Sequence, residues 1–317
     1  MADLRLTLSC GYYDRTLPVL DGRVRADGID LVVESPLTPG TSMGSPDADV
    51  YEVANPALVI QRDRGAPHLG LPIFPRRKFF HQLLLTRTDS KISSFPDFVG
   101  KKIGVLRWYQ HALGVWLRGH LKDQYGIHEN EIHWFAEREN QFPMEGSAGV
   151  KITVVDDGKG LAHMLLDGEL DVVGHENAHN ILLEHRELKR VFPNFKEVEA
   201  AYFKETGVFP INHALAIKKR IVEQHPWVTS SLVRAFETAK RVALDALDRD
   251  NSLLSTPWIA HVLEDQYRFL KRDMFPYGLE ANRRELETHV RYLHGQHLIS
   301  RLIPLDEIYA RETDGLV

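Results

Sequence analysis

The chain of 317 residues is longer than the roughly 100–200 residues of an ordinary domain, so we expect two domains of moderate size. Its 39 Lys and Arg against 44 Asp and Glu give a formal net charge of -5, which provides no basic footprint for a nucleic acid or an anionic membrane. The single Cys10 excludes an intramolecular disulfide, and the 16 histidines have no Cys partners at the spacing of a structural zinc site.

The first ten residues, "MADLRLTLSC", differ from an export signal. They carry Asp3 and Arg5 and lack the apolar run of roughly 7–15 residues that such a signal needs. No stretch of the sequence approaches the roughly 18 apolar residues of a membrane helix. We therefore expect a cytoplasmic protein.

The first part of the chain predicts an α/β lobe. Apolar residues alternate in "LRLTLSC" (4–10), the short helix "LPVLDGRV" ends around Gly22, and "GIDLVV" (28–33) predicts a second strand. The elements expected next are strand 48–53, helix 56–64 and the long strand "FFHQLLLTR" (79–87). This order is a β-α-β opening.

A second α/β unit is predicted from the capped turn at residue 93 onward. Its expected elements are strand 102–106, an amphipathic helix ending at Gly126, strand 151–157, helix 160–170 and strand 171–175. The strand "HALAIKK" (213–219) and helix 226–247 then return the chain to the first lobe. The tail from Asn251 to Val317 is expected to be helical and polar.

The two crossing strands, 79–87 and 213–219, predict where the lobes meet. We assign residues 1–82 and 219–317 to lobe I and residues 83–218 to an inserted lobe II, with a ligand cleft between them. Three polar segments follow predicted strands: "GYYDRT", "RWYQH" and "GHENAH". Because the carboxyl ends of strands face the ligand crevice in open α/β sheets, we expect these segments to line the cleft.

Four segments resemble the 4,5-dihydroxyphthalate decarboxylase family: "CGYYDRTLPVLDGRVRADGIDL", "FPRRKFFHQLLLTRTDS", "GVFPINHALAIKKRIVEQHPWV" and "FPYGLEANRRELETHVRYL". The likeness covers nearly the whole chain. It implies a two-lobed fold similar to that of type II periplasmic binding proteins. It also implies a carboxy-lyase of phthalate degradation that converts 4,5-dihydroxyphthalate to 3,4-dihydroxybenzoate (protocatechuate).

The chain departs from the family pattern at three expected pocket positions. Where an apolar "EMSLSS"-like segment is usual, it has "VYEVANPAL" with Glu52 and Asn55. Where a small Ser-Ala-Arg type of loop is usual, it has "GHENAH" with His175 and Glu176, and Tyr12 replaces what is commonly Asp. We include Glu52, Asn55, His175 and Glu176 among the candidate substrate-binding residues.

Decarboxylation of an arene without an electron-sink cofactor requires a proton donor for the ring carbon and a group that binds the ring hydroxyl. His81 and His213, one at each crossing, are the candidate donors, because an imidazole with an ordinary pKa of about 6.5 can hold and release a proton. Either histidine could instead be a hydrogen-bonded interior residue. Asp14 is the candidate for the hydroxyl, with helix capping as its alternative. We expect no metal or organic cofactor.

The second carboxylate of the substrate requires a fixed cation, which Arg can bind through two hydrogen bonds. The candidates are Arg15, Arg76 and Arg77. For Arg15 the alternative is a surface ion pair with Asp14 or Asp21, and for "PRRK" (75–78) it is a solvated basic face. Tyr13 lies beside Arg15 in the same polar segment and is a further candidate.

A helix start predicts another place for a carboxylate. Tyr109, Gln110 and His111 lie at the expected N-terminus of a helix, where free amides and the positive end of the helix dipole attract anions. An ordinary capped helix start is the alternative.

The sequence also allows a metal site and a different class of protein. His175, Glu176 and His179 could hold a divalent ion, although the two histidines would share a face only on a helix and we expect a loop there. A cytoplasmic, non-catalytic protein that binds an aromatic acid is the competing class, and an enzyme of cofactor or quinone biosynthesis on the same fold ranks below it. The expected partner is an aromatic dicarboxylate, with no nucleic acid or membrane; homo-oligomer formation is left open.

Overall fold

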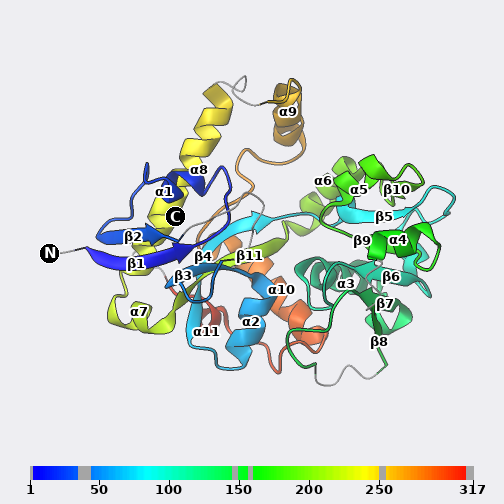
Figure 1. Cartoon of the computed structure of the whole chain (residues 1–317), viewed down its shortest axis with the longest axis horizontal. Helices are drawn as coiled ribbons and strands as arrows, with labels where there is room; N and C mark the ends of the chain where they lie inside the picture. The colour runs from blue at the N-terminus through cyan, green and yellow to red at the C-terminus, as the bar shows by residue number, and fades with distance from the viewer. Residues whose placement is uncertain (1–2, 35–43, 145–148, 156–159, 250–254, 312–317) are drawn as a thin grey trace. The chain divides into compact units, whose positions relative to one another are not determined.

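The computed structural model describes residues 3–34, 44–144, 149–155, 160–249 and 255–311, which form two compact units (Figure 1). Unit 1 comprises Met1–Arg77, Ile211–Leu286 and Ile303–Val317, and unit 2 comprises Lys78–Pro210 and Glu287–Leu302. The sequence predicts divisions after residues 82 and 218. The two units divide at Arg77 and Pro210 instead, and unit 2 also includes Glu287–Leu302.

Unit 1 is built on a five-stranded mixed sheet with the strand order β2-β1-β3-β11-β4. Its strands are β1 (Leu4–Ser9), β2 (Ile29–Val33), β3 (Val50–Ala54), β4 (His68–Arg77) and β11 (Ile211–Lys218). Strand β1 is parallel to β2 and β3, whereas β11 is antiparallel to β3 and β4. The returning strand β11 therefore lies between two strands from the first 77 residues.

Several helices of unit 1, above all α8 (Val228–Arg249), pack against this sheet and contribute to its core. The helical segments of unit 1 are α1 (Leu17–Leu20), α2 (Asn55–Asp63), α7 (Lys219–Gln224), α8, α9 (Ile259–Phe269), the 3₁₀ turn η5 (Glu280–Asn282) and α11 (Leu305–Ile308). The first half of α8 buries Leu232 and Phe236 against strand residues such as Leu8 and Leu215. Each such side chain contributes about 1.5–3 kcal/mol on full burial, so α8 anchors the sheet that carries the polar residues described below.

Unit 2 is built on a six-stranded sheet with the order β10-β5-β9-β6-β7-β8. Its strands are β5 (Leu84–Arg87), β6 (Lys102–Val105), β7 (His133–Ala136), β8 (Lys151–Val154), β9 (Val172–Gly174) and β10 (Leu188–Arg190). Its helical segments are η1 (His81–Leu83), η2 (Phe95–Phe98), α3 (Ala112–Tyr125), η3 (Glu129–Glu131), α4 (Leu161–Leu166), α5 (Ala178–Glu184) and α6 (Phe195–Thr206), while α10 (Arg283–Gly295) starts in unit 1 and ends in unit 2. Helix α3 ends at Gly126 with a φ of 66°, as its sequence predicts.

The expected strand 79–87 is wrong in its first half. The extended segment is β4, which ends at Arg77, and residues 81–83 form the 3₁₀ turn η1 before β5 begins. Phe79 and Phe80 are buried among aromatic rings of unit 2, which favours a turn over an extended segment at this point.

Parts of two further predictions lie outside the described residues: 156–157 of the expected strand 151–157, and 251–254 with 312–317 of the tail. Among the described residues, no helix combines the length and apolar character needed to cross a membrane.

Candidate active site

A buried histidine–glutamate pair lies on one face of the unit 1 sheet. His213 on β11 is paired with Ala54 of β3, and Leu215 is paired with Glu52, so the His213 and Glu52 side chains project from the same face. The Nδ1 atom of His213 lies 2.6 Å from Oε1 of Glu52. His213 is 5% exposed and Glu52 is fully buried. The sheet register therefore holds an imidazole against a carboxylate away from bulk water.

Glu52 accepts two further hydrogen bonds from the segment after β1. The Gly11 amide donates to Oε2 at 2.6 Å, and the Tyr13 hydroxyl donates to Oε1 at 2.8 Å. A buried carboxylate without partners would be strongly destabilising, and these donors satisfy its oxygen atoms. Burial raises the pKa of the Tyr13 hydroxyl far above its usual range, the Glu52 carboxylate raises it further, and the Arg76 guanidinium opposes both.

Gly11 is required by the close approach of these groups. A Cβ atom at this position would lie 2.7 Å from the Tyr13 ring and 2.8 Å from Oε2 of Glu52. Both distances are shorter than van der Waals contact, so any larger residue would displace one of the two side chains.

Arg76 adds a positive charge on the same face. It lies on β4 directly opposite His213 of β11, and directly opposed residues of an antiparallel pair share a face. Its guanidinium acts on the ionisation of Tyr13, which places its charge near the Glu52 cluster. The structure thus brings together Tyr13, Glu52, Arg76 and His213 from four segments of the chain.

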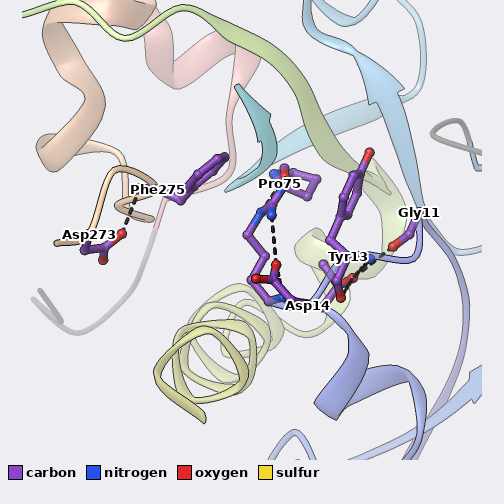
Figure 2. Close-up of polar contacts among 8 residues, drawn as sticks. Gly11, Tyr13, Asp14, Pro75, Asp273 and Phe275 are labelled. Atoms are coloured by element: carbon purple, nitrogen blue, oxygen red, sulfur yellow. Dashed lines mark hydrogen bonds and ion pairs between the residues drawn. The ribbon is translucent and has the colours of Figure 1, made fainter. Parts of the chain in front are cut away.

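Arg15 lies beside this cluster and is held by several contacts. Its Nε atom donates to the Pro75 carbonyl at 2.8 Å, and its Nη1 atom lies 3.0 Å from Oδ1 of Asp14 (Figure 2). The guanidinium carbon lies 4.5 Å from the centre of the Tyr13 ring and 4.1 Å from that of Phe275. Arg15 therefore forms the ion pair with the exposed Asp14 carboxylate that was its alternative role.

Arg77 and Asn55 are directed into the interior of unit 1. Arg77 donates to Asn282 and to the Pro276 carbonyl and pairs with Glu285 at 3.5 Å. Burial lowers the pKa of Arg77 to about 10, with Glu285 opposing, so it stays charged near neutral pH. Asn55 accepts a hydrogen bond of 2.6 Å from the Tyr309 hydroxyl. The geometry gives both residues packing contacts within unit 1.

His81 is enclosed by aromatic rings in unit 2. It is 1% exposed and stacks on Phe80 with ring centres 4.3 Å apart, and His120 and Tyr202 also contact its ring. Among the described residues, none forms a hydrogen bond with its buried Nδ1 atom. Burial, with a smaller effect of His120, lowers the pKa of His81 to about 3. A histidine that stays neutral near pH 7 is poorly suited to hold the proton required for the reaction.

The residues at the predicted helix start in unit 2 make contacts with other residues of the same chain. The Tyr109 ring is buried under the Arg118 guanidinium, 3.5 Å from its carbon, and the Gln110 side chain bridges the Phe142 carbonyl and amide at 2.7 and 3.2 Å. His111 caps α3 by accepting from the Leu113 amide at 3.4 Å. The structure therefore shows an ordinary capped helix start, the alternative given for this segment.

A second polar cluster, distinct from the unit 1 cluster, lies within unit 2. The Nε2 atom of His111 is 3.7 Å from Oε1 of Glu176, and Lys78 donates to the Glu176 carbonyl at 3.0 Å. His175 accepts from the Asn177 amide at 3.0 Å, and burial lowers the pKa of His175. Lys78 was not among the predicted residues, although the run "PRRK" contains it.

His179 lies one residue into α5, whereas His175 precedes that helix. No three His, Cys, Asp or Glu side chains within the described part of the chain form a group that could hold a metal ion. Cofactor independence therefore stays a prediction.

No family model matches the chain. The chain is 30% identical over 321 residues to the 4,5-dihydroxyphthalate decarboxylase of Comamonas testosteroni, covering 98% of this chain and 97% of that protein. It is also 30% identical over 183 residues to the enzyme of the same name from Pseudomonas putida, covering 55% of this chain and 70% of that protein.

Solved structures share the fold at lower identity. The periplasmic aliphatic sulphonate binding protein SsuA from Escherichia coli matches with a TM-score of 0.57 and 13% identity, covering 98% of each chain. The desulfurization enzyme DszB matches with a TM-score of 0.52 and 18% identity, covering 98% of this chain and 97% of DszB. The predicted two-lobed fold of the type II periplasmic binding protein kind is thereby confirmed. With 30% identity along almost its whole length to a decarboxylase, the chain belongs to the 4,5-dihydroxyphthalate decarboxylase family of carboxy-lyases.

Proposed function

We propose that this protein converts 4,5-dihydroxyphthalate to 3,4-dihydroxybenzoate and CO₂, as a step of phthalate degradation, without a metal or organic cofactor. The single observation that carries the proposal is the buried His213–Glu52 pair on the same sheet face as Arg76. This arrangement supplies a proton carrier and a cation for a carboxylate. The names of the relatives support the choice of substrate.

The proposed reaction starts with protonation of the ring carbon that bears the departing carboxylate. In this substrate each carboxylate is para to a hydroxyl, whose oxygen donates electron density and stabilises the protonated ring. Nε2 of the His213 imidazolium donates the proton, the bond between the ring and the carboxylate breaks, and its electron pair restores the aromatic ring. One proton is consumed and one CO₂ leaves, and water returns a proton to His213.

Arg76 is assigned to the carboxylate that remains in the product. It faces the same side of the sheet as His213, and a guanidinium can hold a carboxylate through two hydrogen bonds. Arg15, fixed beside the Tyr13 ring, adds positive charge next to this site. Because the retained carboxylate does not react, its contacts contribute equally to binding in the ground state and the transition state.

The decisive experiment incubates the purified protein with 4,5-dihydroxyphthalate and measures CO₂ and protocatechuate together. His213→Gln should retain binding, measured by calorimetry, and lose about 10²-fold or more in single-turnover rate, the scale of a lost general acid. His261→Gln is the matched control, because His261 is exposed on α9 and distant in sequence from the cluster.

Three results would overturn the proposal. Tight binding of the substrate without turnover by the wild type would identify a non-catalytic binding protein. Wild-type turnover by His213→Gln would place the proton donor elsewhere. Activity that a chelator abolishes and one divalent ion restores would contradict the cofactor-free reaction.

A further inference from the structure

We propose that Glu52, assisted by Tyr13, is a positioning residue that fixes which nitrogen of His213 transfers the proton. The catalytic consequence rests on the proposed function. The geometric part concerns unit 1 alone and can be tested without any assay of activity.

The hydrogen-bond donors around Glu52 determine the state of His213. An ionised carboxylate can only accept hydrogen bonds. Oε2 already accepts from the Gly11 amide, and Oε1 accepts from the Tyr13 hydroxyl. Because Nδ1 of His213 lies 2.6 Å from Oε1, this nitrogen must carry a hydrogen that it donates. Nε2 is therefore the nitrogen left to gain and release a proton.

The same contacts balance the charge of the proton carrier. In the protonated state the imidazolium lies against a fully buried carboxylate, which compensates its positive charge. After the proton leaves, the neutral ring keeps its hydrogen on Nδ1 and its bond to Glu52. The histidine therefore stays in one orientation through the cycle. Tyr13 and Gly11 in turn hold the carboxylate still.

Glu52→Gln tests this arrangement because the fixed amide of Gly11 dictates how the new side chain can lie. Its carbonyl oxygen must accept from Gly11, which turns the NH₂ group toward Nδ1 of His213 and the Tyr13 oxygen. The NH₂ group is a donor, so a neutral His213 must then accept at Nδ1 and carry its hydrogen on Nε2. The substitution thus inverts the tautomer while preserving the size of the side chain.

The first readout is the ¹⁵N NMR spectrum of protein labelled at histidine, with the His213 signals assigned by their loss in His213→Gln. We expect the neutral ring of the wild type to be protonated at Nδ1 and that of Glu52→Gln at Nε2. Tyr13→Phe is the matched variant: it removes one donor to Glu52 but leaves Nδ1–H bonded, so its tautomer should match the wild type. A wild-type His213 with its hydrogen on Nε2 would overturn the proposal, even where Glu52→Gln fails to fold.

The second readout separates kcat from KM with 4,5-dihydroxyphthalate. Glu52→Gln should lower kcat about 10²-fold or more with KM changed less than about threefold, since the substrate carboxylate is bound elsewhere. Tyr13→Phe should lower kcat less than about tenfold. Equal losses in kcat for the two variants, or a change confined to KM, would overturn the positioning role.

The two readouts distinguish the two proposals. If the tautomer inverts in Glu52→Gln and no variant of His213 affects turnover, Glu52 positions His213 as inferred but the proposed proton donor is wrong. If His213→Gln is inactive and the tautomer of Glu52→Gln equals that of the wild type, the decarboxylase proposal holds and the role of Glu52 does not.

Discussion

Arg76 and His213 lie directly opposite each other on neighbouring antiparallel strands, although they are far apart in the sequence. The pairing of β4 with β11 places a permanent cation and an imidazole on one face of the sheet. These are the two groups that the proposed function assigns to the substrate, His213 to the ring carbon that loses its carboxylate and Arg76 to the carboxylate that remains.

Arg76→Met should weaken binding more than it slows chemistry. A charge-assisted hydrogen bond contributes about 1.5–3 kcal/mol, so we expect KM to rise roughly 10- to 150-fold with kcat changed less than about threefold. Steady-state kinetics provides the measurement. Arg23→Met is the control, because Arg23 is exposed and pairs with Asp21. If KM is unchanged in both Arg76→Met and Arg15→Ala, the anion site of unit 1 is wrong.

Arg77→Met should destabilise the fold and leave substrate binding nearly unchanged. The substitution removes the charge that pairs with buried Glu285 and the donor to the Asn282 side chain. Loss of one partner of a buried ion pair costs about 3–5 kcal/mol. Urea denaturation at pH 7 measures the change, with Arg76→Met at the neighbouring position as the comparison. Equal stability of the two variants would contradict the interior role of Arg77.

His81 should make the stability of the protein depend on pH. Burial and His120 lower the pKa of His81 to about 3, below the unfolded value of about 6.5. Between these two pH values the unfolded chain therefore binds a proton at this residue that the folded chain does not bind. The stabilising contribution is complete above about pH 6.5 and is lost as the pH falls toward about 3, by up to about 1.4 kcal/mol per pH unit.

His81→Phe isolates this effect because an aromatic ring of similar size fills the same enclosure. Urea denaturation at pH 7.5 and pH 5 should show a smaller loss of stability in His81→Phe than in the wild type, by about 1–2 kcal/mol. His261→Gln, at an exposed site on α9, should follow the wild type. Parallel stability curves for the wild type and His81→Phe would show that folding does not lower the pKa of His81.

Gly11→Ala should disrupt the site through steric overlap. The new methyl group would lie within 2.8 Å of both the Tyr13 ring and Oε2 of Glu52, so one of them must move. We expect kcat to fall at least about tenfold, since the carboxylate that holds His213 loses its place. Gly295→Ala is the control, because a Cβ atom there approaches only the Lys122 side chain, at 3.9 Å. Normal kinetics of Gly11→Ala would contradict the packing described around Glu52.

Local patterns in the sequence predict most elements of the fold, but strands β4, β7 and β10 are missed, and β4 is the one that carries site residues. Pro72 and Pro75 interrupt its apolar pattern, and proline usually argues against a strand. In the structure β4 lies at the edge of the sheet, where missing amide donors are tolerated, and its register with β11 shifts twice. The sequence offers no local signal for either property.

Candidate residues could be found from the sequence, but their partners could not. His213 and Glu52 were each predicted, yet their contact depends on β11 inserting beside β3, which is a property of the sheet order. Their places at the two crossings give His81 and His213 equal standing in the sequence. Both are buried in the structure, but His213 contacts the Glu52 carboxylate, whereas no described residue forms a hydrogen bond with the buried Nδ1 atom of His81. Arg76 and Arg77 are neighbours in one basic run, and only their partners in the structure, His213 on β11 for Arg76 and Asn282 and Glu285 for Arg77, distinguish them. The cytoplasmic location stays a prediction.

The position of β11 between β3 and β4 has a consequence for how the protein is made. A ribosome that has synthesised the first 77 residues has produced β1 to β4, but the strand that joins β3 to β4 is still missing. All of Lys78–Pro210 must emerge before Ile211–Lys218 can enter the gap. The six-stranded sheet of unit 2 can thus form during synthesis before the unit 1 sheet is complete, although Glu287–Leu302 joins unit 2 only later. A nascent chain stopped at residue 210 would expose the unpaired edges of two strands to aggregation.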